Sequence, residues 1–228
     1  MLYICIAFSV IVPYLLCSIN PAIIAAKIKS GKDIREMGSG GAGLTNALRT
    51  QGKKVAVIVL LCDVLKGVLS ILLIMLFCRL VWDWHIKDMV RHLFPDCSCC
   101  PPDNNPYTYL CMWIGSLAGV LGHCYPIFHK FKGGKAVLVT VATGLVINWL
   151  AALIALVLFI IIVKISKYVS LGSIIASIAY PICVGLVGTG RMEAVVICSV
   201  ITLILIFKHR GNIQRLIAGT ENKLGAKK

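Results

Sequence analysis

The apolar run from Ala136 to Val163, AVLVTVATGLVINWLAALIALVLFIIIV, decides how this chain can fold. Its 28 residues would form a helix of about 42 Å, whereas the hydrocarbon core of a bilayer is about 30 Å thick. One straight helix would need an extreme tilt to fit that core. Gly144 and the polar Asn148 beside Trp149 offer a break. We therefore predict two short helices, Ala136 to Ile147 and Trp149 to Val163.

The rest of the chain has the composition of a membrane protein. Hydrophobic residues make up 59% of it, charged residues only 14%, and the mean hydropathy is +0.91. We predict a single all-α integral-membrane domain over residues 1–228, with about seven transmembrane helices, several of them short. The remaining apolar runs are Leu2 to Ala26, Val55 to Cys78, Tyr109 to Gly122, Val169 to Gly188 and Ala194 to Phe207.

The distribution of positive charge predicts the orientation. The first run has no basic leader and is followed by lysines, so we expect a retained span with the amino terminus outside. Seven spans then place 18 of the 23 Lys and Arg residues in cytoplasmic loops and in a cytoplasmic carboxyl-terminal tail. Six spans would export that basic tail. A nucleic-acid partner is not expected, because the basic residues lie in short gaps between apolar runs.

An extracytoplasmic loop is expected near residues 81–106. Acidic residues outnumber basic ones there, which fits the outer side. Cys97, Cys99 and Cys100 could form a disulfide or bind a metal ion, but their spacing is not a recognised zinc pattern and His92 is the only additional ligand nearby. We expect no metal and no cofactor, and the redox state of these thiols is left open.

A first polar segment runs from Gly38 to Arg49. Gly38, Gly40 and Gly43 satisfy G-x-G-x-x-G, but no strand precedes them, so a dinucleotide site is not expected. The glycine backbone can still curl and direct N–H groups at an anion. Additional donors come from the side chains of Ser39, Thr45, Asn46 and Arg49. The alternative is a flexible loop between two helices.

A second polar segment contains Lys132, Gly133, Gly134 and Lys135. It is not a nucleotide P-loop, because Ala136 replaces the Ser or Thr that would hold magnesium. Two lysines around two glycines at the start of a helix predict an anion site, since unpaired N–H groups and the helix dipole favour negative charge there. The alternative is that these lysines only set the topology.

A third polar segment follows the last apolar run and extends to Glu221. His209 and Asn212 share one helical face, whereas Arg215 lies off it. A basic tail that binds anionic lipid is the alternative interpretation. His209 is compatible with a proton carrier, an anion donor or a structural partner.

Two charged residues lie deep in the second apolar run. Asp63 and Lys66 are three positions apart and would be costly facing lipid. We expect them to pair with each other and to turn inward.

Together these segments resemble the bacterial PlsY-type family of membrane acyltransferases. The three family motifs, G-S-G-N-x-G-x-T-N, G-H-x-x-P-x-F-x-x-F-K-G-G-K-G and K-H-R-x-N-I-x-R-L-x-x-G-x-E, match in order between Gly38 and Glu221, and the D-V-L-K-G run at Asp63 also fits. Gly41 stands where the family has Asn, and Ala136 stands where it has Gly. The cysteine-rich outer loop is not part of the pattern.

The resemblance implies a specific reaction. A fatty acyl group would pass from acyl phosphate to glycerol-3-phosphate, giving 1-acyl-glycerol-3-phosphate (lysophosphatidate) and phosphate, the first acylation step of phospholipid synthesis. The enzyme would lie in a bacterial cell (inner) membrane with its site on the cytoplasmic face. Implied partners are glycerol-3-phosphate, long-chain acyl phosphate, membrane lipid and an acyl-phosphate-forming enzyme to which it is functionally coupled.

The resemblance also carries site assignments onto this sequence. We expect both phosphates to be held in one chamber formed by the three segments. The expected catalytic residues are Ser39, Arg49, Lys135, His209 and Asn212. The expected substrate-binding residues are Gly38, Gly40, Gly43, Thr45, Asn46, Lys132, Gly133, Gly134, Arg210 and Arg215, and the expected structural residues are Asp63, Lys66 and Glu221.

Because acyl phosphate has a good leaving group, positioning and charge stabilisation could supply most of the rate acceleration without an acyl-enzyme.

Three other classes of protein are alternatives to this family. A soluble-type glycerolipid acyltransferase would show H-x-x-x-x-D, which is absent from the sequence. A transporter of phosphorylated solutes would favour ionisable residues at the midplane and a repeated architecture. A lipid-binding scaffold would have no turnover.

Overall fold

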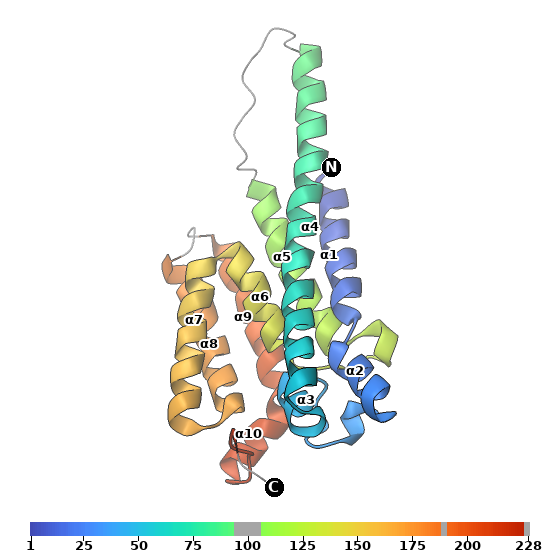
Figure 1. Cartoon of the computed structure of the whole chain (residues 1–228). Helices are drawn as coiled ribbons and strands as arrows, with labels where there is room; N and C mark the ends of the chain where they lie inside the picture. The colour runs from blue at the N-terminus through green and yellow to red at the C-terminus, as the bar shows by residue number, and fades with distance from the viewer. Residues whose placement is uncertain (94–105, 188–190, 226–228) are drawn as a thin grey trace.

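The computed structural model describes residues 1–93, 106–187 and 191–225, and this part of the chain is helical (Figure 1). The twelve helical elements, which include two short 3-10 turns, are α1 (Leu2–Ser18), α2 (Pro21–Ser30), η1 (Ile34–Glu36), α3 (Leu44–Gln51), α4 (Lys53–Leu93), α5 (Pro106–Cys124), η2 (Ile127–His129), α6 (Val137–Ile147), α7 (Trp149–Ser166), α8 (Val169–Val187), α9 (Met192–Lys208) and α10 (Arg210–Ile217).

The predicted break in the long apolar run is confirmed. Helix α6 ends at Ile147 and α7 begins at Trp149. Asn148 lies between them, and its side-chain oxygen accepts a hydrogen bond from the backbone N–H of Ala151 at 3.2 Å. This bond satisfies one of the unpaired donors at the start of α7, which explains why a polar residue is needed there.

The first apolar run is also broken, which we did not predict. Helix α1 ends at Ser18, and α2 begins at Pro21 after the buried Asn20. The Asn20 side-chain oxygen accepts from the N–H groups of Ala22 and Ile23, both at 3.1 Å. Pro at the first helical position and Asn before it form a strong helix-start signal, and the chain therefore turns at this point.

Helix α4 is longer than expected. It continues to Leu93. The first part of the loop expected near residues 81–106 is therefore helical. The rest of that region, with Cys97, Cys99 and Cys100, lies outside the described residues. The predicted extracytoplasmic position of residues 81–106 stays a prediction.

The all-helical membrane class is confirmed. Within the described residues, five segments are long and apolar enough to cross a bilayer, and a sixth results if the bent pair α9 and α10 is one span. Helix α6, with 11 residues, is only about 16 Å long. The number of crossings and the sides of the two termini therefore remain predictions.

Helix α4 has a surface that faces lipid and a surface that faces the protein interior. On α4, Leu61, Leu65, Leu72 and Leu76 are exposed, as expected of a lipid-facing surface, whereas Asp63 and Lys66 are buried. Helices α1, α4 and α5 pack together, α7, α8 and α9 form a second group, and α6 lies between the groups (Figure 1). Helices α3 and α10 lie at the same end of the bundle.

Close approach of α1 and α5 depends on glycine. A Cβ atom added to Gly122 of α5 would collide with the backbone carbonyl of Tyr14 on α1, whereas one added to Gly185 of α8 would lie 3.6 Å from the nearest atom, Val195 Cγ2. Small residues that let helix backbones approach are typical of membrane helix packing.

We expect Gly122→Ala to lower the free energy of unfolding by about 1–3 kcal/mol, because the added methyl group overpacks the α1–α5 contact. Gly185→Ala is the matched control and should be neutral or stabilising, since alanine favours helix. Unfolding of both variants in one detergent would check this. Equal stability of the two variants would contradict the prediction.

Candidate functional site

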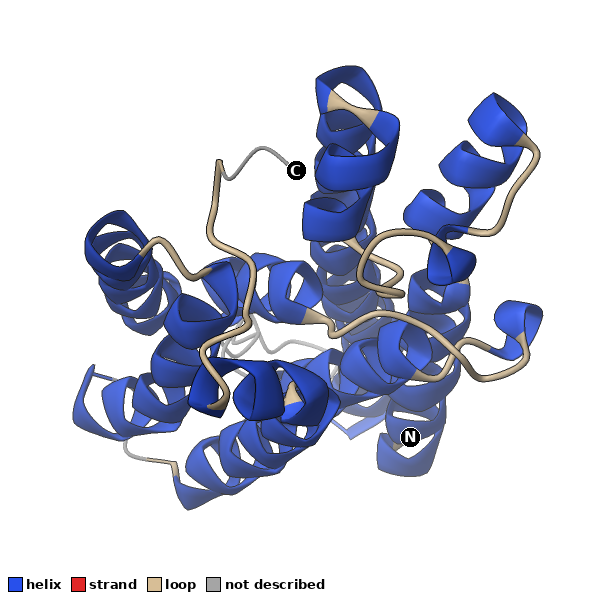
Figure 2. Ribbon diagram, turned by 90° about the horizontal axis from the view of Figure 1, so that it is seen from below, coloured by secondary structure: helices blue, strands red, loops and turns tan. Residues whose placement is uncertain are grey.

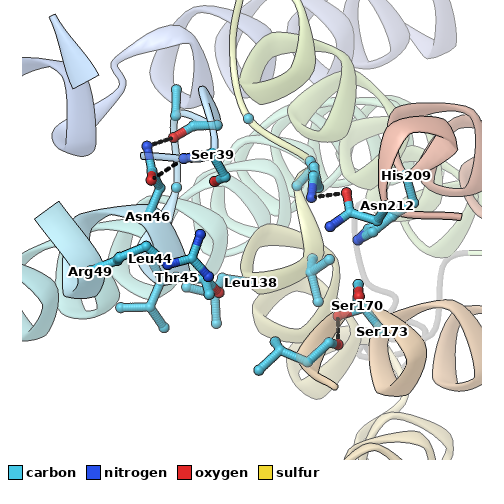
Figure 3. Close-up of a pocket in the computed structure, with 18 of the residues that line it drawn as sticks. Ser39, Leu44, Thr45, Asn46, Arg49, Leu138, Ser170, Ser173, His209 and Asn212 are labelled. Carbon is cyan, nitrogen blue, oxygen red and sulfur yellow. Dashed lines mark hydrogen bonds between the residues drawn. The ribbon is translucent and has the colours of Figure 1, made fainter. Parts of the chain in front are cut away.

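The three polar segments meet in one cavity. It has a volume of about 170 Å³ and lies between the glycine loop before α3, the start of α6, the start of α8 and the junction of α9 with α10. Arg49, Lys135 and His209 all line it, so the predicted convergence is confirmed. In Figure 3, Ser39, Thr45 and Arg49 lie on one side of the cavity, and His209, Asn212 and Ser170 lie on the other.

The cavity lies toward the end of the bundle where α3 and α10 are found, and Figure 2 shows the loops that gather there. Most of the predicted site residues reach it: Ser39, Gly43, Thr45, Asn46, Arg49, Asp63, Gly134, Lys135, His209, Asn212, Arg215 and Glu221. Six do not line it: Gly38, Gly40, Lys66, Lys132, Gly133 and Arg210.

Asn46 organises the glycine loop. Its side-chain nitrogen donates to the carbonyls of Ile34, Met37 and Gly41 at 2.9–3.0 Å, and its oxygen accepts from the N–H of Ser39 at 2.9 Å. Both polar atoms of Asn46 are therefore engaged by the loop backbone, and we expect its influence on a ligand to act through the shape of the loop. Gly38 contributes to this shape because it has a φ of +57° and because a Cβ there would overlap Asn46 Oδ1.

Arg49 is the cation of this wall. It is exposed to the cavity, and no hydrogen bond or ion pair to its guanidinium occurs within the part of the chain that the structure describes. A planar guanidinium without a protein partner is suited to a phosphate group. The Ser39 hydroxyl lines the same wall, and among the described residues it forms no hydrogen bond to a histidine or carboxylate.

The second segment differs from its prediction. The N–H groups of Gly133 and Gly134 donate to the carbonyls of Cys124 and His123 at 3.2 and 3.1 Å, so they are not unpaired. The unpaired amides belong instead to the first turn of α6, where Val137 and Leu138 line the cavity. A helix start of this kind attracts anions. The unpaired N–H groups expected at the head of this helix are therefore present in α6, and the two glycine amides do not add to them.

The two lysines of this segment have different positions. Lys135 is mostly buried at the cavity, whereas Lys132 is exposed and lies outside it. Between Lys135 and α6, Ala136 has a φ of +58°. This left-handed conformation is disfavoured for residues with a Cβ atom and explains why the family pattern has glycine here.

A polar chain connects Lys135 to the tail. Lys135 donates to the side-chain oxygen of Asn212, and the Asn212 nitrogen donates to Glu221 Oε1 at 2.7 Å. Arg215 and Ser170 also donate to Glu221, at 2.7 and 2.9 Å. Burial raises the pKa of Glu221, but the hydrogen bonds from Asn212, Arg215 and Ser170 together lower it below its ordinary value.

Lys135 has a shifted pKa. Burial lowers its pKa to about 8, and the charges of Arg215, Lys208 and Arg49 add to the shift, although Glu221 opposes it. The charged form of Lys135 is thus poorly compensated in the empty cavity. A phosphate group would compensate it.

His209 is neutral and has a defined tautomer. Its Nδ1 lies 2.8 Å from the carbonyl of Leu205, so Nδ1 must carry the proton and donate, and Nε2 is left as an acceptor. Burial and then the charge of Lys135 lower its pKa to about 4. His209 can therefore accept a hydrogen bond but is a weak base.

Arg210, the next residue, does not line the cavity. Its guanidinium carbon lies 4.5 Å from the centre of the Phe207 ring.

Sequence reasoning missed Arg35 and Asp33. Arg35 Nη1 donates to the carbonyls of His129 and Lys132 at 2.9 and 2.8 Å, and Asp33 holds the same guanidinium at 2.6 Å. Arg35 thereby ties the first segment to the second. The hydrogen bond from Arg35 holds the pKa of Asp33 below its ordinary value. The opposite charges of Asp33 and Arg35, two residues apart before the glycine loop, could have indicated their ion pair. They give no indication of the contacts to His129 and Lys132.

A second cavity, of about 110 Å³, lies beside the first. The two share Val137, Leu138, Phe159 and Ser173 as lining residues. The lining of the second is mostly apolar and adds Ala155, Leu156, Ala176 and Tyr180, among others. No group of three or more His, Cys, Asp or Glu residues that could hold a metal ion occurs within the described residues.

The fold and site define an integral membrane protein in which a cationic cavity lies next to an apolar one. The sequence model of the glycerol-3-phosphate acyltransferase family matches residues 7–219 of this chain, and the chain belongs to this family. It is 37% identical to the glycerol-3-phosphate acyltransferase of Clostridioides difficile (strain 630), over 96% of this chain and 95% of the relative. It is 38% identical to that of Trichormus variabilis, over 96% and 91% of the two chains.

Solved structures agree with this assignment. The crystal structure of PlsY (YgiH), an integral membrane glycerol 3-phosphate acyltransferase, in its glycerol 3-phosphate form is similar with a TM-score of 0.77 and 33% identity, over 96% of both chains. Its lysophosphatidic acid form has a TM-score of 0.72 and 32% identity, over 96% and 95% of the chains. The chain is therefore an acyltransferase, and the transporter and scaffold alternatives are set aside.

We expect Arg35→Lys to raise the KM for glycerol-3-phosphate about tenfold, because lysine cannot bridge two carbonyls and a carboxylate with one planar group. Arg210→Lys is the matched control, since Arg210 lies outside the cavity. Steady-state kinetics of both variants would check this. If the two variants have the same KM, the proposed link between the loops has no role in binding.

Proposed function

We propose that this acyltransferase uses acyl phosphate as the donor and makes 1-acyl-glycerol-3-phosphate and phosphate. The observation that carries the proposal is a cationic cavity that shares four lining residues with an apolar one. Acyl phosphate needs both environments, and glycerol-3-phosphate needs the first. The forms in which the PlsY neighbour was solved, with glycerol 3-phosphate and with lysophosphatidic acid, fit the same substrate and product.

The cationic cavity has two walls that suit two phosphates. Ser39, Thr45 and Arg49 form one wall, and Asn46 maintains its shape. Lys135 and the first turn of α6 form the other, with Asn212 holding the Lys135 ammonium. Arg215 adds positive charge but is paired with Glu221. In this proposal Lys132 and Arg210 act only at the surface.

The acyl chain would occupy the apolar cavity between α6, α7 and α8. Val137 and Leu138, at the start of α6, line both cavities. The phosphate bound at this helix start would therefore lie directly beside the entrance for the chain. Burial of apolar surface contributes roughly 0.8 kcal/mol per methylene group, so the chain would supply much of the binding free energy.

The reaction would need no protein nucleophile. The 1-hydroxyl oxygen of glycerol-3-phosphate attacks the acyl carbon, the bond from that carbon to the phosphate oxygen breaks, and phosphate leaves with the bonding electrons. The hydroxyl proton passes to a phosphate oxygen, because His209 with a pKa of about 4 is the weaker base. Before the attack, His209 Nε2 accepts a hydrogen bond from the hydroxyl and orients it, and the proton leaves this hydrogen bond for the phosphate oxygen as the new C–O bond forms. Arg49 and Lys135 stabilise the charge that develops on the phosphates.

The proposed location is a bacterial cell membrane, with the cavity on the cytoplasmic face. Both phosphate substrates are polar and would enter from that side, whereas the acyl chain and the product would exchange with lipid. An enzyme that forms acyl phosphate would be the functional partner, because no activated acyl group is made by the proposed reaction itself.

The donor is tested by incubating the purified protein with glycerol-3-phosphate and palmitoyl phosphate, and separately with palmitoyl-CoA. We expect lysophosphatidate only with palmitoyl phosphate, at a rate abolished by Arg49→Ala. Product formation from palmitoyl-CoA at an equal rate would disprove the choice of donor while leaving the acyltransferase assignment intact.

The lowered pKa of Lys135 predicts that phosphate binding depends on pH. A lysine binds phosphate when it is protonated, so binding is intact below its pKa of about 8 and weakens as the pH rises through that value. The phosphate group itself, with a second pKa of about 6, does not titrate between pH 7 and 9. We expect the KM of the substrate held by Lys135 to rise about tenfold from pH 7 to pH 9.

The control is Lys135→Arg, because the guanidinium stays charged over this range. Its KM should be higher than that of the wild type at pH 7 but nearly constant up to pH 9. A KM that rises equally in both proteins would show that Lys135 is not the group responsible.

A further inference from the structure

A buried cluster of three ionisable residues borders the cavity and has no role in the reaction proposed so far. Asp63, Lys66 and His123 are 2%, 6% and 3% exposed, and they lie on α4 and α5. The predicted Asp63–Lys66 pair is confirmed, with 2.8 Å between Lys66 Nζ and Asp63 Oδ1. Burying such groups within a membrane helix bundle is costly, which suggests a function.

All three donors of the Lys66 ammonium have acceptors. Nζ lies 3.2 Å from the carbonyl of Cys17, 2.8 Å from that of Ile19 and 3.0 Å from His123 Nδ1. Asp63 Oδ1 lies 2.8 Å from the same nitrogen and balances its charge, although the angle between them does not favour a hydrogen bond. An ammonium group cannot accept, and His123 Nδ1 must therefore be the acceptor.

This arrangement fixes the tautomer of His123. Its Nδ1 is 3.6 Å from Asp63 Oδ1, which is too long for a hydrogen bond, so Nδ1 has no reason to carry a proton there. A proton on Nδ1 would also point at the Lys66 ammonium. The proton of the neutral ring is therefore on Nε2.

The Nε2–H group faces the cavity beside the second segment. A Cβ atom on Gly134 would overlap Nε2, and both His123 and Gly134 line the cavity next to Lys135. Within the described residues no hydrogen-bond acceptor is found for Nε2. Nε2 is in contact with the cavity and is not fully enclosed, so a ligand oxygen there can accept a hydrogen bond from it.

We propose that His123 Nε2–H donates a hydrogen bond to the phosphate that Lys135 holds, and that Lys66 is the positioning residue that sets the tautomer. The ligand oxygen belongs to glycerol-3-phosphate or to acyl phosphate, which share this chemistry. The inference rests on the proposed function, because it assumes that a phosphate occupies this part of the cavity.

The kinetic test compares His123→Ala, His123→Gln and His123→Asn. Gln carries an N–H₂ group near the place of Nε2, and Asn carries one near Nδ1. We expect Ala and Asn to raise the KM of one phosphate substrate by 10-fold or more, and Gln to recover most of the loss. The substrate whose KM changes identifies the phosphate. Unchanged KM values for both substrates, or equal defects in Gln and Asn, would overturn the proposal.

The tautomer can be tested without turnover. In ¹⁵N-histidine-labelled protein in detergent, the signals absent from His123→Gln should show an unprotonated Nδ1 and a protonated Nε2. A protonated Nδ1 would overturn the proposal even if all variants are active. Lys66→Met should weaken the preference for Nε2–H, and retention of that preference would remove Lys66 from its positioning role.

These outcomes are separable from failure of the proposed function. If the wild-type protein makes no lysophosphatidate from palmitoyl phosphate, the proposal that acyl phosphate is the donor is disproved. The KM for glycerol-3-phosphate with any active donor and the ¹⁵N spectrum would still decide the role of His123.

Discussion

The site depends on positive charge that the protein itself does not fully compensate. Arg49, Lys135 and Arg215 line one cavity, and Glu221 already receives donors from Asn212, Arg215 and Ser170. Lys135 is partly desolvated and no carboxylate pairs with it directly, and its lowered pKa reflects this cost. A ligand that carries phosphate removes the cost when it binds. The polar chain from Lys135 to Glu221 therefore keeps the ammonium in place without neutralising it.

The two buried histidines of the cavity complement each other. The Nδ1–H of His209 donates to the carbonyl of Leu205, which leaves Nε2 as an acceptor. The Lys66 ammonium donates to Nδ1 of His123, which leaves Nε2–H as a donor. One ring can thus hold a hydroxyl group and the other a phosphate oxygen. Neither ring needs to change its charge for this division of roles, which suits a reaction whose leaving group can take up the proton itself.

The sequence predicts features that local chemistry decides. The break at Asn148 follows from one polar residue in an apolar run, and the shared cavity was expected because the predicted topology puts the basic segments on one side of the membrane. Contacts between distant segments are different. Arg35 meets His129 and Lys132, which are 94 and 97 residues away, and no local pattern encodes them. The pairing of the Gly133 and Gly134 amides was also missed, because it depends on how the loop folds back on α5.

The two departures from the family pattern act in opposite directions. Gly41 has an ordinary φ, and a Cβ there would lie 3.7 Å from Ser39 Oγ, so the backbone does not require glycine at this position. Ala136 has a φ of +58°, where a side chain costs about 1 kcal/mol. Alanine in this conformation therefore destabilises the backbone between Lys135 and α6 relative to glycine. The chain thus lacks a side chain where the backbone would tolerate one, and carries a side chain where the backbone disfavours it.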